Sequence, residues 1–215
     1  MSEIDNPVKP LLRGWIHAVA AVALVALSPW LITRSSLTSH RLWSLCFLVG
    51  VEIMLVTSAL FHRVTWTPAR RRAMRRADHS AIFFAIAGSY LAVGGLTMHG
   101  TFRVVMLSLI GGGALVGVAI RQLSLDAPKW VNTLPYLVMG WSAIGVLPQM
   151  YRGGGSEAFF LVLGGGLAYS LGALCYALKR PRLRPAIAGY HEVFHALTIV
   201  GAGCHFAAVY ILLAR

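Results

Sequence analysis

Long apolar runs constrain the fold of this chain more than any other feature of its sequence. Runs of about 20 residues with few charges recur along almost the whole length, and each could cross about 30 Å of hydrocarbon as an α-helix. Apolar residues make up 57% of the chain and charged residues only 12%, with a mean hydropathy of +0.69. A soluble domain of this size needs a more charged surface. The sequence therefore predicts an all-α membrane protein for which the bilayer is the solvent.

Seven of these runs predict a seven-helix transmembrane bundle with short connections. We expect the spans at about 14–33, 42–62, 79–98, 102–121, 131–150, 157–178 and 190–213. This divides the chain into a short amino-terminal segment, residues 1–13, and one transmembrane domain, residues 14–215. The glycine runs 111–113 and 164–166 are expected to let helix backbones approach closely, because small residues line such interfaces.

Basic residues are distributed unevenly between the two sides that seven spans define. Fourteen of the 19 Lys and Arg residues, among them Lys9, fall before the first span or after the second, fourth and sixth spans. The remaining five lie on the opposite side: Arg34, Arg41, Arg103, Arg152 and Arg215. Positive charge is retained on the cytoplasmic side, so we expect a cytoplasmic amino terminus and an outer carboxyl terminus in an inner (plasma) membrane. Topology thus explains the net charge of +12 without a nucleic-acid partner.

Polar and ionisable side chains gather near the cytoplasmic ends of three predicted spans. His62 ends the second span, Ser58 lies one turn deeper on the same face, and Asp78 opens the third span. His191 and His195 lie four residues apart in the first turns of the seventh span. A charged residue at the centre of a membrane helix costs at least about 2.5 kcal/mol, so such residues require an explanation. At about 1.5 Å of rise per residue, all five reach a similar depth.

Three imidazoles and a carboxylate at one depth are typical of a zinc site. Neutral imidazole suits Zn²⁺, and a histidine pair at i, i+4 can bind one ion from a single helix face. Three protein ligands would leave a fourth position for water, which Asp78 could deprotonate with Ser58 close by. Each residue also has an ordinary structural explanation. Asp78 could pair with Arg75 or Arg76, and Ser58 could bond the carbonyl one turn back, but their common depth favours one shared site.

At these residues the sequence resembles the hemolysin III family, the bacterial branch of the progestin and adiponectin receptor family. The matching motifs, in order from about residue 10 to the end, are Leu12-Arg13-Gly14-Trp15-Ile16-His17, Ser58-Ala-Leu-Phe-His62, Asp78-His79, Tyr176-Ala-Leu-Lys-Arg-Pro181 and His191-Glu-Val-Phe-His195. The resemblance implies a zinc ion held by His62, His191 and His195, with Asp78 on the metal-bound water and Ser58 near it. It also implies kinship with membrane hydrolases such as alkaline ceramidases, and a role in membrane-lipid homeostasis.

The favoured function is zinc-dependent hydrolysis of a membrane-lipid amide or ester, with membrane lipids as the expected partners. One alternative is a receptor-like regulator without enzymatic activity, in which zinc clamps the helices. Another is a pore-forming haemolytic protein, although a pore would need polar residues along the full height of several helices. His191-Glu192-x-x-His195 also fits the zinc-protease pattern with Glu192 as general base, but no Asp occurs after position 126 to supply a third ligand.

Several membrane residues are left without an assigned role by the sequence. His17 and His79 share the inner level, where each could be a ligand or a neighbour of one. Glu52, near the middle of the second span, could exchange protons or pair with His205 or Tyr90, but is expected to be protonated and inert. His205 itself lies about 21 Å along the helix from the start of the histidine pair, too far to join the site.

Overall fold

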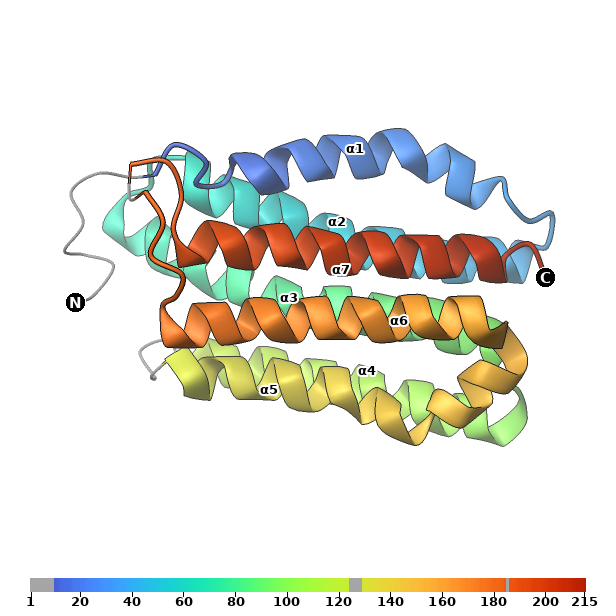
Figure 1. The fold of residues 1–215 in the computed structure, drawn as a ribbon. Coiled ribbons are helices and arrows are strands. Elements are labelled where there is room, and N and C mark those ends of the chain that lie inside the picture. Colours follow the sequence, from blue (N-terminus) through green and yellow to red (C-terminus); the bar gives the residue numbers. More distant parts are fainter. Residues whose placement is uncertain (1–9, 124–128, 185) are drawn as a thin grey trace.

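Seven α-helices and one short 3₁₀ helix make up the part of the chain that the computed structural model describes, residues 10–123, 129–184 and 186–215. They are α1 (Trp15–Ile32), α2 (Thr38–Arg63), α3 (Pro68–Thr97), α4 (Gly100–Leu123), α5 (Lys129–Trp141), η2 (Ser142–Gly145), α6 (Leu147–Leu178) and α7 (Tyr190–Leu212) (Figure 1). No β-strand occurs within these ranges, which confirms the all-α class. Lys9 and the rest of residues 1–9 lie outside the described residues, as do the side chains of residues 129–132.

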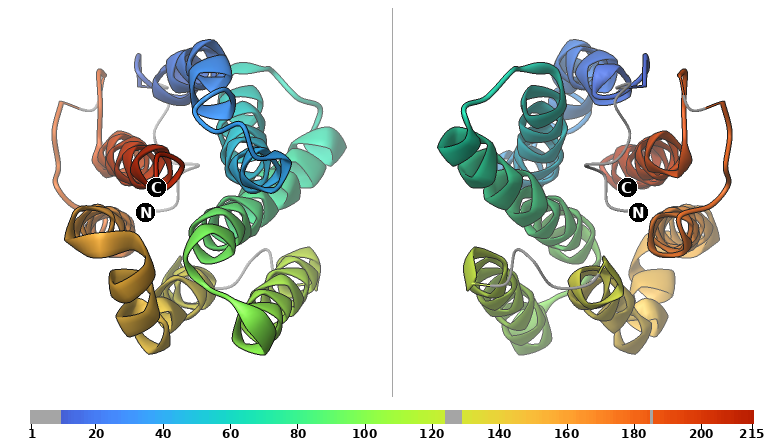
Figure 2. Two further views of the ribbon diagram at one scale, coloured as in Figure 1. Left: turned by 90° about the vertical axis from the view of Figure 1, so that its right-hand side faces the viewer. Right: turned by 90° about the vertical axis from the view of Figure 1, so that its left-hand side faces the viewer.

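The helices form a closed ring in the order of the sequence (Figure 2). Each helix packs against the next, and α7 returns to contact α1. Helix α3 also contacts α5, α6 and α7, so it lies closest to the centre of the bundle. Helix α1 begins at one end of the bundle and the carboxyl terminus lies at the other (Figure 1).

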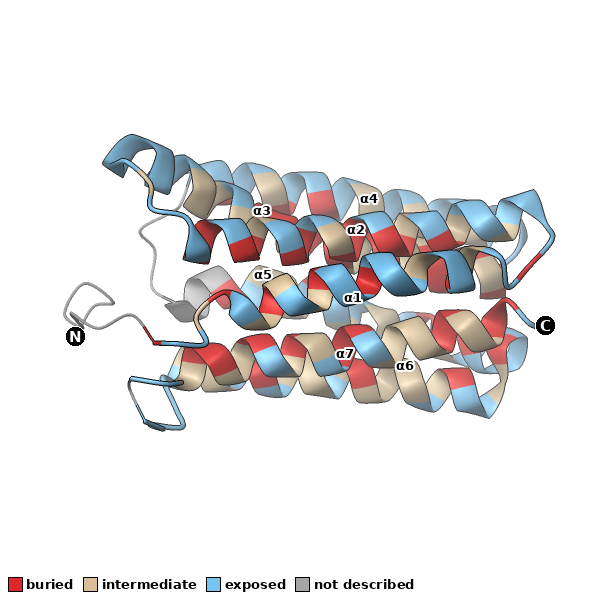
Figure 3. Cartoon of the chain, turned by 90° about the horizontal axis from the view of Figure 1, so that it is seen from above, coloured by how far each residue is buried: buried red, intermediate tan, exposed pale blue. Residues whose placement is uncertain are grey.

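Apolar side chains cover the outside of the bundle as well as its core. Val22 and Leu115 are 72% and 70% exposed, whereas Phe47 and Ala208 at helix interfaces are fully buried. The outward faces of α1 and α4 are largely exposed along their length (Figure 3). Six helices are long and apolar enough to cross a membrane; α5, with 13 residues, is shorter than the others. An apolar exterior on helices of this length identifies a membrane protein.

Three predicted helix boundaries are wrong. The fifth span, expected to reach residue 150, ends at Trp141, where the short helix η2 follows. Helix α3 starts at Pro68 rather than at residue 79, so Asp78 lies in its third turn instead of opening it. Proline is favoured in the first turn of a helix, and the Arg and Ala residues that follow are good helix formers, so the helix extends beyond its apolar part. Helix α6 starts at Leu147 rather than at 157, and bends at Gly155 where φ is 75°.

The break between α5 and α6 is stabilised by a tyrosine of α3. The Tyr90 hydroxyl lies 3.0 Å and 2.9 Å from the carbonyl oxygens of Met139 and Gly140, and 3.1 Å from Ser142 Oγ. These carbonyls are at the end of α5, where intrahelical partners run out. The side chain therefore supplies a donor at a place where lipid could not.

The expected role of the glycine runs is only partly correct. A Cβ built on Gly112 or Gly113 would meet nothing within 4 Å, so no described helix packs against this run in α4. Gly165 does allow a close approach, to the His205 ring. The closest backbone contact instead comes from two isolated glycines: a Cβ on Gly50 would overlap the Phe84 carbonyl of α3, and it would lie 3.3 Å from the Cα of Gly88.

Candidate metal centre

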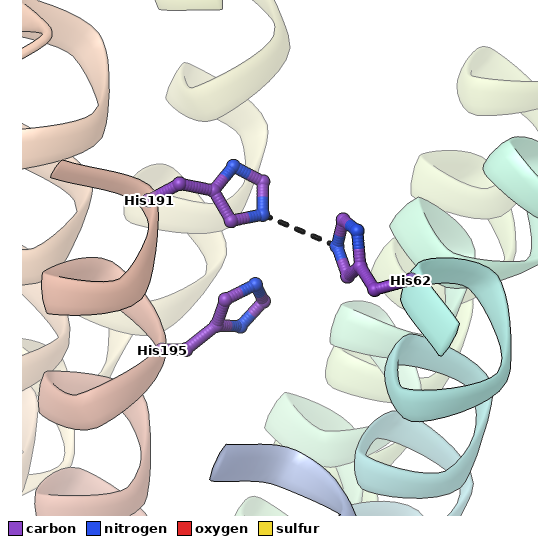
Figure 4. A group of neighbouring side chains, drawn as sticks. All are labelled: His62, His191 and His195. Carbon is purple, nitrogen blue, oxygen red and sulfur yellow. Dashed lines mark hydrogen bonds between the residues drawn. The ribbon is translucent and has the colours of Figure 1, made fainter. Parts of the chain in front are cut away.

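Three buried imidazoles converge near the end of the bundle at which α1 begins (Figure 4). His62 comes from the last turn of α2, and His191 and His195 come from the first turns of α7. Their nearest ring nitrogens all lie within 4.8 Å of one another. The Nε2 atoms of His62 and His191 are 3.1 Å apart. The structure thus brings together all three predicted metal ligands.

One pair of this donor set has the spacing of a tetrahedral metal site, and the three nitrogens together are spread over as much as 4.8 Å. Zinc–imidazole bonds of about 2.0–2.1 Å at tetrahedral angles place two ligand nitrogens about 3.3 Å apart, close to the separation of the His62 and His191 Nε2 atoms. His195 Nε2 is buried without a hydrogen bond to any described residue. Buried polar atoms ordinarily find a partner, and a cation shared by the three rings would provide one.

His195 is oriented by a fourth histidine, from α1. Its Nδ1 atom lies 3.0 Å from His17 Nε2, and the two rings pack edge to face with their centroids 4.1 Å apart. Since Nδ1 of His195 is engaged by His17, Nε2 is the atom left for a metal. The sequence placed His17 at the correct depth, and the structure shows that it contacts a ligand residue without belonging to the three-nitrogen group.

Glu192, the central residue of the protease-like motif, is held by groups other than the histidines. Its carboxylate accepts a hydrogen bond from the Gly189 amide at 2.7 Å and forms an ion pair with Arg13. The side chain is only 2% exposed. A carboxylate that is buried and neutralised by an Arg is poorly suited to act as a general base, which argues against the protease alternative.

Ser58 and Asp78 line the same cavity as the three histidines. The Ser58 hydroxyl is buried and forms no hydrogen bond within the described ranges, so it does not bond the carbonyl one turn back. Asp78 Oδ2 lies 3.5 Å from His79 Nδ1. His79 Nδ1 donates a hydrogen bond to the Arg75 carbonyl at 2.8 Å, so His79 is held by its own helix.

The cavity beside the histidines has a volume of about 740 Å³, within the range of roughly 300–1,000 Å³ that is usual for ligand sites. Along α3 its lining runs from Arg71 to Gly94, which corresponds to about 35 Å of helix. Most of the wall beyond the histidines is apolar, with Ile82, Ile86 and Val93 on α3. The site is therefore the polar end of a long, mostly apolar chamber.

His205 and Glu52 lie away from the metal centre. His205 lines the same chamber but is not in the histidine group, and its Nε2 is 3.3 Å from the Val162 carbonyl oxygen. One carboxylate oxygen of Glu52 is buried and forms no hydrogen bond to a described residue. Tyr90 is engaged at the α5 break, so neither partner considered for Glu52 from the sequence shows a hydrogen bond to it.

Fold and site together define a class: a helical membrane protein with a buried three-histidine group that could hold a metal ion. A family profile described as Haemolysin-III related matches residues 6–206, and the chain belongs to this family. The resemblance found from the motifs is thereby confirmed.

Similar proteins come from bacteria and from plants. Hemolysin-3 of Bacillus cereus is 26% identical over 207 residues, covering 96% of this chain and 90% of that protein. The Hemolysin-3 homolog of Bacillus subtilis (strain 168) is 28% identical over 163 residues, covering 76% and 73%. The Heptahelical transmembrane protein ADIPOR2 of Oryza sativa subsp. japonica is 30% identical over 183 residues, covering 78% and 80%.

Proposed function

We propose that this protein is a zinc-dependent hydrolase that cleaves an amide or ester bond of a membrane lipid. The observation that carries the proposal is the position of three convergent imidazoles at one end of a long, mostly apolar cavity. A cavity of that shape suits an acyl chain, and its polar end lies where the carbonyl of a membrane lipid would meet the headgroup layer.

The proposed topology has seven crossings, a cytoplasmic amino terminus and an outer carboxyl terminus. The 13-residue α5 and the four-residue η2 together span about 27 Å, nearly the thickness of the hydrocarbon core. An odd number of crossings agrees with the opposite positions of the start of α1 and the carboxyl terminus (Figure 1). The heptahelical name of the rice relative supports the same count. Retention of positive charge in the cytoplasm then places the metal centre at the inner face of the inner membrane.

His62, His191 and His195 would hold the zinc ion. When bound, zinc supplies Lewis acidity that polarises a carbonyl and makes water a stronger acid. Asp78 is proposed to accept the proton of the attacking water and to deliver it to the leaving group. The Ser58 hydroxyl, buried beside His62, is proposed to hold the reacting carbonyl or water by a hydrogen bond. The apolar wall excludes bulk water and aligns the acyl chain.

The proposal is tested by metal analysis and lipid turnover on the purified protein. We expect about one zinc ion per chain, and its loss in both His62→Ala and His195→Ala, because either change removes one of three ligands. The exposed His99→Ala variant serves as the matched control and should keep the metal. Incubation with ceramide-like lipids and phospholipids should release fatty acid from at least one of them.

Two results would count against the proposal in different ways. A metal-free parent protein, purified without chelator, would remove the zinc site. Bound zinc without fatty-acid release from any lipid would assign the metal a structural role, and the protein would then be a regulator rather than an enzyme.

A further inference from the structure

The start of α1 contacts every segment that carries a predicted metal ligand. Arg13, Gly14 and His17 lie within five residues of one another, and each touches a different part of the histidine group or its immediate neighbours. Three separate contacts from so short a segment are more than helix packing requires. Each contact has a distinct physical effect on the residue it meets.

His17 fixes the ring of His195. For His195 Nε2 to face a metal, its Nδ1 must carry the proton and donate it in a hydrogen bond to His17 Nε2, 3.0 Å away. Metal-bound histidines commonly donate their other ring N–H to such a partner, which sets the tautomer and the ring orientation. Both side chains are buried, so the contact is shielded from bulk water.

Gly14 fixes the side chain of His62. Its backbone is in the left-handed region, with φ of 81°, and a Cβ at this position would lie 2.8 Å from His62 Cβ. No larger residue fits there unless His62 moves. Helix α1 therefore starts directly against the ligand at the end of α2, with only hydrogen at the point of contact.

Arg13 fixes the first turn of α7. It pairs with Glu192, the residue next to His191. Two backbone hydrogen bonds join the residues before Arg13 to the loop before α7. The Leu11 amide donates to the Ala186 carbonyl at 3.0 Å, and the Leu12 amide donates to the Ile187 carbonyl at 3.1 Å. The position of α7 relative to α1 is thus defined by charge and by backbone contacts.

We propose that residues 13–17 form a clasp that positions the metal ligands: His17 orients His195, Gly14 sets the place of His62, and Arg13 holds the turn that carries His191. The inference rests on the proposed metal centre. None of the three binds the ion. They are positioning residues whose removal weakens metal binding and alters its geometry.

The test is metal affinity in the purified full-length protein. Zinc is removed with a chelator and titrated back against a coloured competing chelator, and Co²⁺ is bound separately to record its visible absorption. We expect His17→Leu to weaken zinc binding by about 10- to 100-fold, the usual effect of losing such a partner, and to shift the Co²⁺ bands. His17→Gln keeps an acceptor for the His195 N–H and should restore most of the affinity. Gly14→Ala should weaken binding by displacing His62.

Matched controls separate the clasp from general destabilisation and from the proposed function. His99→Ala, at the exposed outer end, should leave both the affinity and the Co²⁺ spectrum unchanged, and thermal unfolding of each variant verifies the fold. The clasp is refuted if His17→Leu binds zinc as tightly as the parent with the same Co²⁺ spectrum. It is also refuted if X-ray absorption counts four imidazoles in the parent and three in this variant, because His17 would then be a ligand. A parent that binds no zinc would instead refute the metal centre itself.

Discussion

Ser58, at the end of the bundle that carries the histidines, is buried without the hydrogen bond that similar residues form elsewhere in the molecule. Ser44, Ser89 and Thr198 each donate to the carbonyl four residues back, as hydroxyls in membrane helices often do. Ser58 does not, and its hydroxyl lies at the wall of the cavity beside His62. The hydroxyl is therefore placed to serve a molecule in the cavity rather than its own helix.

Removal of the carboxylate of Asp78 should abolish turnover but spare the metal. If Asp78 transfers the proton, Asp78→Asn lowers kcat by about 10²- to 10⁴-fold, the usual contribution of general acid–base catalysis. Zinc content is expected to stay at the parent level, since Asp78 is not in the ligand group. Fatty-acid release and elemental analysis measure the two effects. Glu157→Gln, which changes an exposed carboxylate at the outer end, is the control. Loss of zinc from Asp78→Asn would show instead that Asp78 is a ligand.

The sequence could predict the three histidines but not what surrounds them. The i, i+4 spacing on one helix and a common depth grouped His62, His191 and His195 as candidates, and the resemblance to the hemolysin III family selected them as the ligand set. The sequence could not distinguish a ligand from a ligand's neighbour, because His17 differs from the others only in where its ring nitrogens point. Nor could the sequence show that Arg13 forms an ion pair with Glu192, because the two residues are 179 positions apart and meet only in the folded protein.

At the scale of helices, single glycines at contact points matter more than glycine runs. Gly50 of α2 and Gly88 of α3 face each other across the tightest backbone contact of these two helices. Gly111, Gly112 and Gly113 of α4 have no neighbour within 4 Å of a would-be Cβ. Glycine is therefore required by close packing at Gly50 and Gly88, whereas the glycine run of α4 has room for side chains.

A pair of identical substitutions should separate these two kinds of glycine. Gly50→Ala forces a methyl group into the backbone of α3 and should destabilise the bundle by about 1–3 kcal/mol, the usual cost of overpacking. Gly113→Ala adds a methyl group to open space in a helix and should be neutral or slightly stabilising. Thermal unfolding in one detergent measures both. Equal melting temperatures for the two variants would contradict the close contact between α2 and α3.

Helix existence followed from the sequence, whereas helix ends did not. Apolar length identified the spans because it depends only on composition. The start of α3 at Pro68 and the bend of α6 at Gly155 depend on polar turns that extend beyond the apolar stretch, which hydropathy cannot detect. The Tyr90 contacts that stabilise the end of α5 join residues about 50 positions apart, and no local pattern indicates them.

At the scale of the whole molecule, the ring is closed by its first and last helices. Helix α7 packs against both α6 and α1, and the ligand residues of α2 and α7 meet inside that closure. The candidate metal centre therefore joins α2 and α7, which are far apart in the sequence and meet because the ring of helices closes.

Orientation in the membrane can be read with reporter fusions. If the carboxyl terminus is outside, alkaline phosphatase fused after Arg215 should be active, because this enzyme folds only outside the cytoplasm. A fluorescent protein fused at the same place should be dark, because it fluoresces only in the cytoplasm. Fusions after Lys179, in a connection predicted to be cytoplasmic, should give the reverse. If both positions report the same side, α7, the one proposed crossing between them, does not span the membrane.

The separation of the ligands along the chain has a consequence for biosynthesis. His62 and His191 are 129 residues apart, and the His17–His195 contact joins residues 178 apart. A ribosome releases α2 long before α7, so a growing chain exposes one half of the ligand set with nothing to complete it. Any metal that binds here would then be loaded among the last events of maturation. A chain that lost only its final helix would keep most of its apolar helices but lack two of the three histidines.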